Sequence, residues 1–478
     1  MEELQRQVET LLKEVAELRT EVVALRTENA ALRAENAALR TENAELKSQV
    51  AELQLELTRR KKGFRPKANT STRTKSTKDR RKADERNHPG TTRPEPPLDE
   101  STVQQHEVTA DVCPECQGQL VDTGEFIDQI VEDIPQPKVE VHRYRRHVYE
   151  CPCCQKKVTG NSTEVSPHAR IGPNAVVLQA YCRAHLGLSL GKANDLLEQF
   201  MGLAQSRVAA LGQLCRMGDL FDPVVQELLK ILRDEPVIHA DETGWRINGK
   251  NVWCWVFCNP RLALYLIDNH RSSAVVERVL GERFEGVLVT DFYAAYGRLQ
   301  ADKQKCLTHL LRELFTLRKE LPQAAVDAFI QPVMTLFQDA IALAKQRDTL
   351  DATAFAQQRQ QLEDRLDTLI FSKPKHPECQ RICKRLVKHR FELLLFLEKS
   401  EVPSDNNLAE RDIRSVAAAR ADGGVNRSDR GAKVFANIKT VIRTCQKQGL
   451  NFFDYARNVL RATLTGLPPP LPLATADT

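Results

Sequence analysis

Leucine recurs at every seventh position through residues 1–58, and the positions between are mostly charged or small. Valine, asparagine and leucine fill the other apolar position of each heptad, a combination that favours two parallel strands in a fixed register. The pattern predicts a parallel coiled coil, and therefore a homodimer or pairing with a similar helix. The recurring leucines are Leu4, Leu11, Leu18, Leu25, Leu32, Leu39, Leu46 and Leu53.

Charges beside this apolar seam agree with parallel pairing. Glutamate at position g is followed by a basic residue at the next e position in successive heptads, from Glu14 with Arg19 to Glu42 with Lys47. Each such pair is opposite in sign between parallel chains. A single long solvated helix is the alternative interpretation, and the unbroken run of heptads argues against it.

Helical periodicity returns at residues 163–234. Two helices are predicted there, at 190–200 and 204–217, with Gly202 in the short turn between them. This pattern is typical of a helix-turn-helix unit that reads DNA, although an ordinary helical hairpin has the same pattern.

From residue 235 the pattern changes to strands. Apolar runs predict strands at 236–247, 251–259 and 262–268, and Asn248-Gly249 is a hairpin turn signal between the first two. Strands at 286–291 and 305–309 follow, with helices predicted at 272–281 and 310–321. Three hairpin strands followed by alternating helices and strands are the order of an α/β ribonuclease-H-like sheet. Residues 235–321 are therefore predicted to form the first part of a catalytic core.

The remainder is predicted to be helical. Residues 322–402, rich in Gln, Ala, Leu and charge, are predicted as a helical insertion. Residues 403–465 are predicted to hold a helix at 405–419 with Ser404 as its N-cap, and two C-terminal helices. Asp422-Gly423-Gly424 is predicted to end the first of these helices, and the Pro-rich residues 466–478 to form a disordered tail.

Charge and composition change this picture locally. The 478 residues carry a net charge of only +5, but residues 59–105 form a basic and then Pro-rich linker. Such a segment is suited to sequence-independent contact with DNA phosphates, or to serving as a solvated tether. The start lacks a secretory signal and no run of about 20 apolar residues is found, so we expect a cytoplasmic, nucleoid-associated protein without a membrane span.

The thirteen cysteines are therefore expected to be thiols or metal ligands rather than disulfides. Cys113 and Cys116 form one CxxC knuckle, and Cys151 and Cys154 form another. Two knuckles at this spacing predict a structural Zn²⁺ site with four thiolate ligands within residues 106–162. Cys153 could replace a neighbour as ligand, and unmetallated buried cysteines are the alternative interpretation.

Three acidic residues carry the predicted chemistry. Asp241 and Asp291 each follow a short apolar run, and Glu410 lies in a predicted helix far downstream. The ribonuclease-H-like strand order would make the two aspartates neighbours. Three converging carboxylates are suited to hold two divalent ions, Mg²⁺ or Mn²⁺, for phosphoryl transfer. Ordinary capping or surface acids are the alternative.

Several other polar and aromatic residues have competing interpretations. Trp245 is either a packing residue or a platform for an unpaired base. His376, Cys379 and Cys383 have a helical spacing that could hold a metal, but buried thiols are the simpler interpretation.

The chain resembles DDE transposases of the IS66 family of bacterial insertion sequences. The matching stretches are HADETGW, TDFYAAYG, KCLTHLLREL, NNLAERDIR and IKTVIRTCQKQGLNFFDYARNVL, and the order of segments is also the family's. The resemblance implies that Asp241, Asp291 and Glu410 form the metal-binding triad. His309 and Arg312 match a His/Arg pair that the family carries after the fifth strand, and are expected beside the active site.

The resemblance also implies cleavage at insertion-sequence ends and transfer of a 3′ hydroxyl into target DNA. Expected partners are double-stranded DNA (terminal inverted repeats and target), a second copy of the chain, and accessory proteins of the same element. On the helix that carries Glu410, the residues expected to share its face or reach a phosphate are Asn406, Asn407, Arg411 and Arg414. A dimeric zinc-containing DNA-binding regulator with a silent catalytic fold, or a nuclease that hydrolyses without joining, are the alternatives.

Overall fold

The structure is a computed structural model. It describes residues 105–473 except for 110–111, 114, 116, 122–123, 125–128, 132, 136 and 422–424. The chain divides into two compact units, Met1–Glu132 and Asp133–Thr478. The coiled coil predicted for residues 1–58 lies outside the described residues, as does the linker predicted for 59–105 apart from its last residue.

A five-stranded sheet with the strand order β5-β4-β3-β6-β7 forms the centre of the second unit. Its first three strands are successive antiparallel hairpins: β3 (Val237–Ile247), β4 (Lys250–Cys258) and β5 (Ala263–Asp268). The turn between β3 and β4 has φ of 48° at Asn248 and 79° at Gly249, the left-handed values of a two-residue hairpin turn. The three predicted hairpin strands are confirmed.

Two parallel strands extend this sheet on the other side of β3. β6 (Arg283–Thr290) pairs with β3, and β7 (Gln300–Lys305) pairs with β6, both in parallel register. The connection from β5 to β6 contains α6 (Ser273–Leu280), as predicted. The connection from β6 to β7 contains the short 3₁₀ helix η1 (Ala294–Gly297), and α7 (Leu307–Glu320) follows β7.

The last strand was predicted at residues 305–309, and this prediction was wrong. β7 ends at Lys305, and α7 already begins at Leu307. The strand sequence QADKQK has no apolar alternation, although Gln304 is fully buried. Its Nε2 donates to the carbonyl of Leu393 at 3.1 Å. A strand whose buried side chains satisfy their polar groups internally gives no hydrophobic signal in the sequence.

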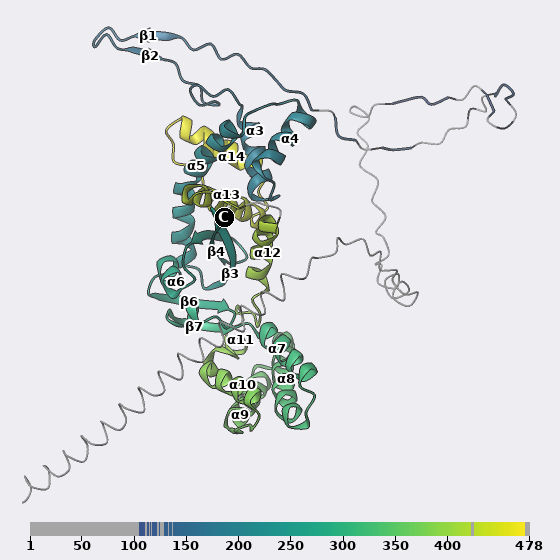
Figure 1. Cartoon of the computed structure of the whole chain (residues 1–478), viewed down its shortest axis with the longest axis vertical. Helices are drawn as coiled ribbons and strands as arrows, with labels where there is room; N and C mark the ends of the chain where they lie inside the picture. Colours follow the sequence, from purple (N-terminus) through teal and green to yellow (C-terminus); the bar gives the residue numbers. More distant parts are fainter. Residues whose placement is uncertain are drawn as a thin grey trace, which may run out of the picture. The chain divides into compact units, whose positions relative to one another are not determined.

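The larger hydrophobic core lies between the hairpin strands and the helices around them. α12 and α13 pack directly on the sheet, α5 packs on α13, and α3 and α14 pack on α5 and α13 (Figure 1). The bounds of these helices and of α4 are α3 (Pro173–Ala184), α4 (Leu190–Met201), α5 (Arg207–Arg233), α12 (Asn407–Ala421), α13 (Asp429–Lys447) and α14 (Phe452–Leu464).

A second core covers the far side of β6. Val287 and Val289 contribute to it from the strand, together with α7 and the helices that follow. Figure 1 shows these helices gathered beyond β6 and β7. The residues predicted as a helical insertion are helical, with α8 (Ala324–Lys345), α9 (Ala352–Phe371), α10 (Pro377–Lys388), η2 (Arg390–Glu392) and α11 (Leu395–Glu398).

Within the described ranges, α8 is the one helix long and apolar enough to cross a membrane, with a mean hydropathy of 1.2. Half of that stretch is buried against the second core, and Pro332 lies inside the helix. A core helix of a water-exposed domain has the same length and composition.

The predicted helix-turn-helix segment is helical, but its second helix is much longer than expected. α4 ends at Met201 and is followed by Gly202, whose φ of 72° is the left-handed value of a helix C-cap. α5 then starts after Ser206, whose side chain accepts the N–H of Ala209, and continues to Arg233. The predicted end at residue 217 was wrong because the apolar face continues through Pro223 and packs on α13.

Alternating strand-like runs at 125–132 and 138–150 in the sequence also predict strands before the second cysteine knuckle. The described part of this region forms strand only at β1 (Val148–Glu150), which pairs with β2 (Lys157–Thr159). The short hairpin therefore encloses the knuckle instead of preceding it. Residues 125–128 and 132 lie outside the described residues.

The Pro-rich end departs from its prediction of disorder as far as residue 473. The hydroxyl of Tyr455 donates to the carbonyl of Pro470 at 2.6 Å, and Leu473 packs against the larger core. Apolar side chains allow this segment to cover α14, an outcome that composition alone does not reveal. Residues 474–478 lie outside the described residues.

Close packing of α5 on α13 leads to a test of the fold. A Cβ atom at Gly218 would lie 2.9 Å from Cα of Val434, so Gly218→Ala requires the helices to separate. We expect a loss of about 1–3 kcal/mol from overpacking. Gly212→Ala on the same helix meets only the end of Arg216 at 3.7 Å and should stabilise by up to about 1 kcal/mol. Urea unfolding of both variants measures the difference, and equal effects would contradict this packing.

Candidate functional site

Asp241 and Asp291 lie on neighbouring parallel strands. The register pairs His239 of β3 with Val289 of β6. Continued by two residues, the same register brings Asp241 level with Asp291, which directly follows the end of β6. The two aspartates are therefore far apart in the sequence but lie on adjacent strands of the sheet, as the strand order predicted.

Backbone hydrogen bonds orient both carboxylates. The N–H of Glu242 donates to Oδ1 of Asp241 at 2.8 Å. The N–H of Tyr293 donates to Oδ1 of Asp291 at 2.8 Å. Each carboxylate keeps its second oxygen for another partner.

Glu410 lies in the first turn of α12. This helix begins at Asn407, and the predicted N-cap Ser404 does not cap it. Instead, Oδ1 of Asp405 accepts the N–H of Asn407 at 2.9 Å, while the carbonyl of Ser404 accepts the N–H of Leu307. The acidic side chain rather than the hydroxyl takes the free N–H group at the helix start.

Asn406 connects the start of α12 to the sheet. Its side chain is buried, with Nδ2 donating to the carbonyl of Ala240 at 2.8 Å and Oδ1 lying 3.0 Å from Nδ1 of His239. Its backbone N–H donates to Sγ of Cys306 at 3.2 Å, and its carbonyl accepts the N–H of Glu410 at 3.1 Å. These bonds place Glu410 beside β3 and the start of α7. Asn406 was expected to share a face with Glu410 or to reach a phosphate, but its amide is engaged inside the protein, which makes it a positioning residue.

A buried ion pair fixes the same helix on its other side. The carboxylate of Asp412 is completely shielded from solvent and lies 2.7 Å from Nε of Arg443 and 3.0 Å from Nζ of Lys447. Both cations come from α13. Removing either partner would leave an uncompensated charge in the core, so this contact restricts how α12 can move relative to α13.

The charges of the three predicted acids act on one another. The pKa of Asp241 is raised from 3.8 to about 7, first by burial and then by the negative charges of Glu242, Asp291 and Glu410. The backbone N–H of Glu242 opposes this rise. Because these negative charges oppose one another, the full set of carboxylates is costly to ionise together unless a cation is present.

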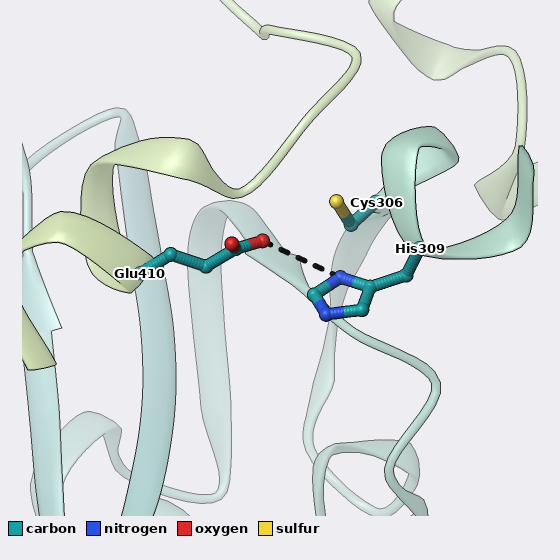
Figure 2. A group of neighbouring side chains, drawn as sticks. All are labelled: Cys306, His309 and Glu410. Carbon is teal, nitrogen blue, oxygen red and sulfur yellow. Dashed lines mark ion pairs between the residues drawn. The ribbon is translucent and has the colours of Figure 1, made fainter. Parts of the chain in front are cut away.

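The tightest group of possible metal ligands is a different one. Among the described residues, ligand atoms of Cys306, His309 and Glu410 all lie within 4.8 Å of one another, and the three acids do not form such a group. Nδ1 of His309 is 3.5 Å from Oε1 of Glu410. Figure 2 shows Glu410 reaching from α12 towards His309, with Cys306 beside both. The structure thus places His309 next to Glu410, as the resemblance implied.

A cavity of about 560 Å³ opens beside this group. Asp291, His309 and Arg312 line it, together with Phe292 and Arg385. Arg312 is exposed on α7. The cavity therefore brings three of the predicted site residues and a second arginine, Arg385, around one open space.

Four residues next to Asp241 and Asp291 were not among the predicted site residues, namely Glu242, Arg271, Tyr293 and Tyr296. Glu242 is buried next to Asp241, with its carboxylate 2.6 Å from Nη2 of Arg271 and hydrogen-bonded to the hydroxyl of Tyr296. Arg271 lies over the ring of Tyr293, with Cζ 3.9 Å from its centroid. Glu242 directly follows Asp241 in the sequence, a signal that could have singled it out. Nothing around Arg271 distinguishes it from other surface arginines.

Lys305 is another buried group that the sequence did not reveal. Its Nζ donates to Oγ1 of Thr290 and to the carbonyl of Asp291, both at 3.1 Å. Burial lowers its pKa to about 8, while the charges of Glu392 and Asp291 oppose that shift. The bonds hold the end of β6, where Asp291 leaves the sheet.

The remaining residues predicted on α12 face solvent. Asn407, Arg411 and Arg414 are exposed, at a spacing that places them along one stripe of the helix. Glu410 precedes Arg414 by one turn, so the stripe leads to the site. These side chains are available to a polyanion.

Trp245 is a core residue. It is buried, stacks on Phe435 with ring centroids 4.9 Å apart, and donates from Nε1 to Asn426 at 2.9 Å. The packing interpretation is confirmed, and a role as a platform for a base is excluded by burial. Cys379 and Cys383 are likewise buried, and the side chain of His376 caps α10.

The two cysteine knuckles have the same backbone turn, each within its own unit. In the first, Gln117 N–H donates to the carbonyl of Cys113 and Gln117 has a φ of 60°. In the second, Gln155 N–H donates to the carbonyl of Cys151 and Gln155 has a φ of 57°. The backbone N–H groups of Cys154 and Cys153 lower the pKa of Cys151. N–H groups directed at sulfur favour a thiolate, the form that binds a metal. Cys116 lies outside the described residues.

Comparison with known proteins gives the family. The Transposase IS66 family matches residues 168–434, more than half of the chain and all three predicted acids. The zinc-finger binding domain of transposase IS66 matches residues 110–155, which supports a structural zinc ion. The chain belongs to the IS66 family of transposases.

Relatives from Sinorhizobium fredii (strain NBRC 101917 / NGR234) carry no assigned activity. "Uncharacterized protein y4jD" is 23% identical over 74% of this chain and 75% of its own length. "Uncharacterized protein y4hP" is 24% identical over 73% and 70%, and "Uncharacterized protein y4qI" is 25% identical over 58% and 54%.

The raised pKa of Asp241 predicts how the metal-free protein responds to pH. Its pKa of about 7 in the folded state exceeds the ordinary value of 3.8. Below pH 3.8 this carboxyl therefore does not change the free energy of unfolding. As the pH rises from 3.8 towards 7 it lowers that free energy increasingly, and above pH 7 the loss stays constant at about a few kcal/mol. In EDTA, Asp241→Asn should gain melting temperature relative to the wild type as pH is raised from 5 to 8. Glu285→Gln, exposed on β6, is the control, and a pH-independent difference would contradict the prediction.

Asn406 supplies a second test of the site. Asn406→Ala leaves the carbonyl of Ala240 without its partner and should cost about 1–3 kcal/mol in urea unfolding. It should also increase labelling of Cys306 by a thiol reagent, read by peptide mass spectrometry, because the start of α12 is loosened. Asn407→Ala, exposed one position later, should change stability by less than about 0.5 kcal/mol. Similar behaviour of the two variants would contradict the role of Asn406 as a positioning residue.

Proposed function

We propose that this chain is a DDE-type transposase with a ribonuclease-H-like catalytic core. It cleaves DNA at insertion-sequence ends in the presence of a divalent metal and transfers the resulting 3′ hydroxyl into target DNA. The core consists of residues 235–321 and 403–465, interrupted by the helical insertion at 322–402. The membership in the IS66 family supports the general activity.

One observation carries the finer proposal. The pKa of Asp241 responds to the charges of Asp291 and Glu410, which come from β6 and from a helix far along the chain. The strand order β5-β4-β3-β6-β7, with the first three strands antiparallel and the others parallel, supports the ribonuclease-H-like assignment. In that fold the acids at the ends of adjacent strands serve one reaction.

The residues present fit Mg²⁺ or Mn²⁺. Asp241, Asp291 and Glu410 supply hard carboxylate oxygens, the ligands such ions prefer. Oε1 of Glu410 is buried and accepts no hydrogen bond, and the negative charges of Asp291 and Glu410 help to raise the pKa of Asp241. The bound ions would supply Lewis-acid activation of the attacking oxygen and stabilisation of the leaving oxygen.

Other side chains of the chain would bind and position the DNA. Arg312 beside the cavity, and Arg411 and Arg414 on the exposed stripe of α12, are placed to contact backbone phosphates. Asn407 can donate a hydrogen bond to the same strand. His309, 3.5 Å from Glu410, would hold or transfer a proton next to the reacting phosphate.

The segments before the core would bring DNA ends together. The coiled coil at 1–58 would pair two copies, and the basic linker at 59–105 would contact phosphates. The helical segment at 163–234 would bind the terminal inverted repeats. Within 106–162, the match to the zinc-finger binding domain supports a structural zinc ion, and the cysteines of the two knuckles, Cys113, Cys116, Cys151 and Cys154, are its proposed ligands. The protein would act in the cytoplasm, on the nucleoid, with accessory proteins of the same element.

A cleavage and joining assay tests the function. The substrate is a linear duplex ending in the inverted repeat that flanks the gene, with a supercoiled plasmid as target and Mg²⁺ present. We expect the full-length chain to nick the end and join it to the plasmid. Asp241→Asn, Asp291→Asn and Glu410→Gln should each reduce both products by at least roughly a hundredfold, the scale expected for losing a central electrostatic group.

The controls separate the competing functions. Glu285→Gln, an exposed acid on the same strand that leads to Asp291, should keep full activity. Band-shift binding of the end duplex by the Asn and Gln variants shows that DNA binding survives. Cleavage without joining would indicate a nuclease, and binding with no metal-dependent cleavage by the wild type would indicate a regulator. Either result contradicts the proposal.

A further inference from the structure

The group formed by Cys306, His309 and Glu410 has ligand types that a Mg²⁺ site does not need. Cys306 is fully buried and is the residue directly before α7, and His309 lies one turn later on that helix. Glu410 enters from α12, and the three ligand atoms lie within 4.8 Å of one another. Figure 2 shows the carboxylate directed at the imidazole, with the sulfur next to both.

Two polar atoms in this group are buried without a hydrogen bond. They are Nδ1 of His309 and Oε1 of Glu410, 3.5 Å apart. A carboxylate oxygen and an imidazole nitrogen lone pair are both acceptors, so they repel unless a proton or a cation lies between them. Buried polar atoms in this state require a partner, because leaving them unpaired costs free energy.

The sulfur decides which cation would be preferred. Mg²⁺ binds oxygen ligands, whereas thiolate and imidazole together favour Zn²⁺ or Co²⁺. The N–H of Asn406 donates to Sγ of Cys306 at 3.2 Å, a contact that supports a thiolate ligand from outside the shell. Zinc bonds of about 2.0–2.3 Å place tetrahedral ligand atoms roughly 3–4 Å apart, so small side-chain rotations would bring the three ligand atoms to one ion and leave its fourth position open.

We propose that Cys306, His309 and Glu410 bind one thiophilic divalent cation of the zinc class, and that this binding competes for Glu410 with Asp241 and Asp291. The binding stands on the geometry alone. The competition rests on the proposed function, because Glu410 matters to catalysis only if the three acids act together. Zinc would then serve the cysteine knuckles at low concentration and withdraw a catalytic carboxylate at higher concentration.

Metal stoichiometry of the full-length protein tests the binding. After equilibrium dialysis against Zn²⁺, elemental mass spectrometry should find one more zinc per wild-type chain than per Cys306→Ser chain. His309→Gln, at a partly exposed position, should lose the same ion and covers the case in which the cysteine variant misfolds. Cys445→Ser is the matched control, since this thiol is also fully buried but belongs to no ligand group among the described residues.

Cobalt spectroscopy and inhibition complete the test. Thiolate-to-cobalt absorption should be stronger in the wild type and Cys445→Ser than in the two cluster variants. In the joining assay with fixed Mg²⁺, inhibition by added Zn²⁺ should require at least tenfold more zinc for Cys306→Ser, each variant being normalised to its own zinc-free rate.

Equal zinc content and equal cobalt spectra in all four proteins would overturn the site. An unchanged zinc dependence of inhibition would overturn the competition. If no joining activity exists at all, the proposed function fails while the dialysis result still decides the binding.

Discussion

The hydrogen bonds of Asn406 are the constraint on which the candidate site depends. The carboxylate of Glu410 begins on a helix more than a hundred residues after Asp291 in the sequence, with a whole helical insertion between them. One buried amide joins that helix to the backbone of β3 and to His239, while the adjacent N–H reaches Cys306 at the start of α7. Three segments are thereby aligned by a residue that need not touch DNA or metal. The buried pair of Asp412 with Arg443 holds the opposite side of the helix.

Holding these acids together works against the stability of the fold. Burial and like charge raise the pKa of Asp241, so its ionisation destabilises the fold in the absence of a cation. The packing around the site must offset this loss of stability. Two apolar cores around one sheet provide this stability, together with polar contacts at the strand or helix end that carries each acid. Lys305 and Asn406 are the clearest examples. An active site built this way is preorganised for positive charge rather than for the empty state.

The sequence predicted those parts whose signal is local. The hairpin strands, the Asn248-Gly249 turn and the helical insertion follow from apolar periodicity and turn chemistry. The pairing of Asp241 with Asp291 followed from strand order. β7 was misplaced because its buried residues are polar, and the start of α12 was misplaced because Asp405, not Ser404, accepts its first free N–H. The tight approach of Cys306 and His309 to Glu410 depends on how two helices meet, which no spacing in the sequence encodes.

β6 has one further consequence for the architecture. Successive residues of this strand point to opposite sides, so Leu288 belongs to the larger core while Val287 and Val289 belong to the second. The two faces of β6 therefore contribute to two different hydrophobic cores. Removing the inserted helices to obtain a minimal catalytic fragment would uncover the face of β6 that belongs to the second core. Val287 and Val289, on the strand that leads to Asp291, would then be exposed. An engineered short form would need polar replacements there before it could be expected to remain monodisperse in solution.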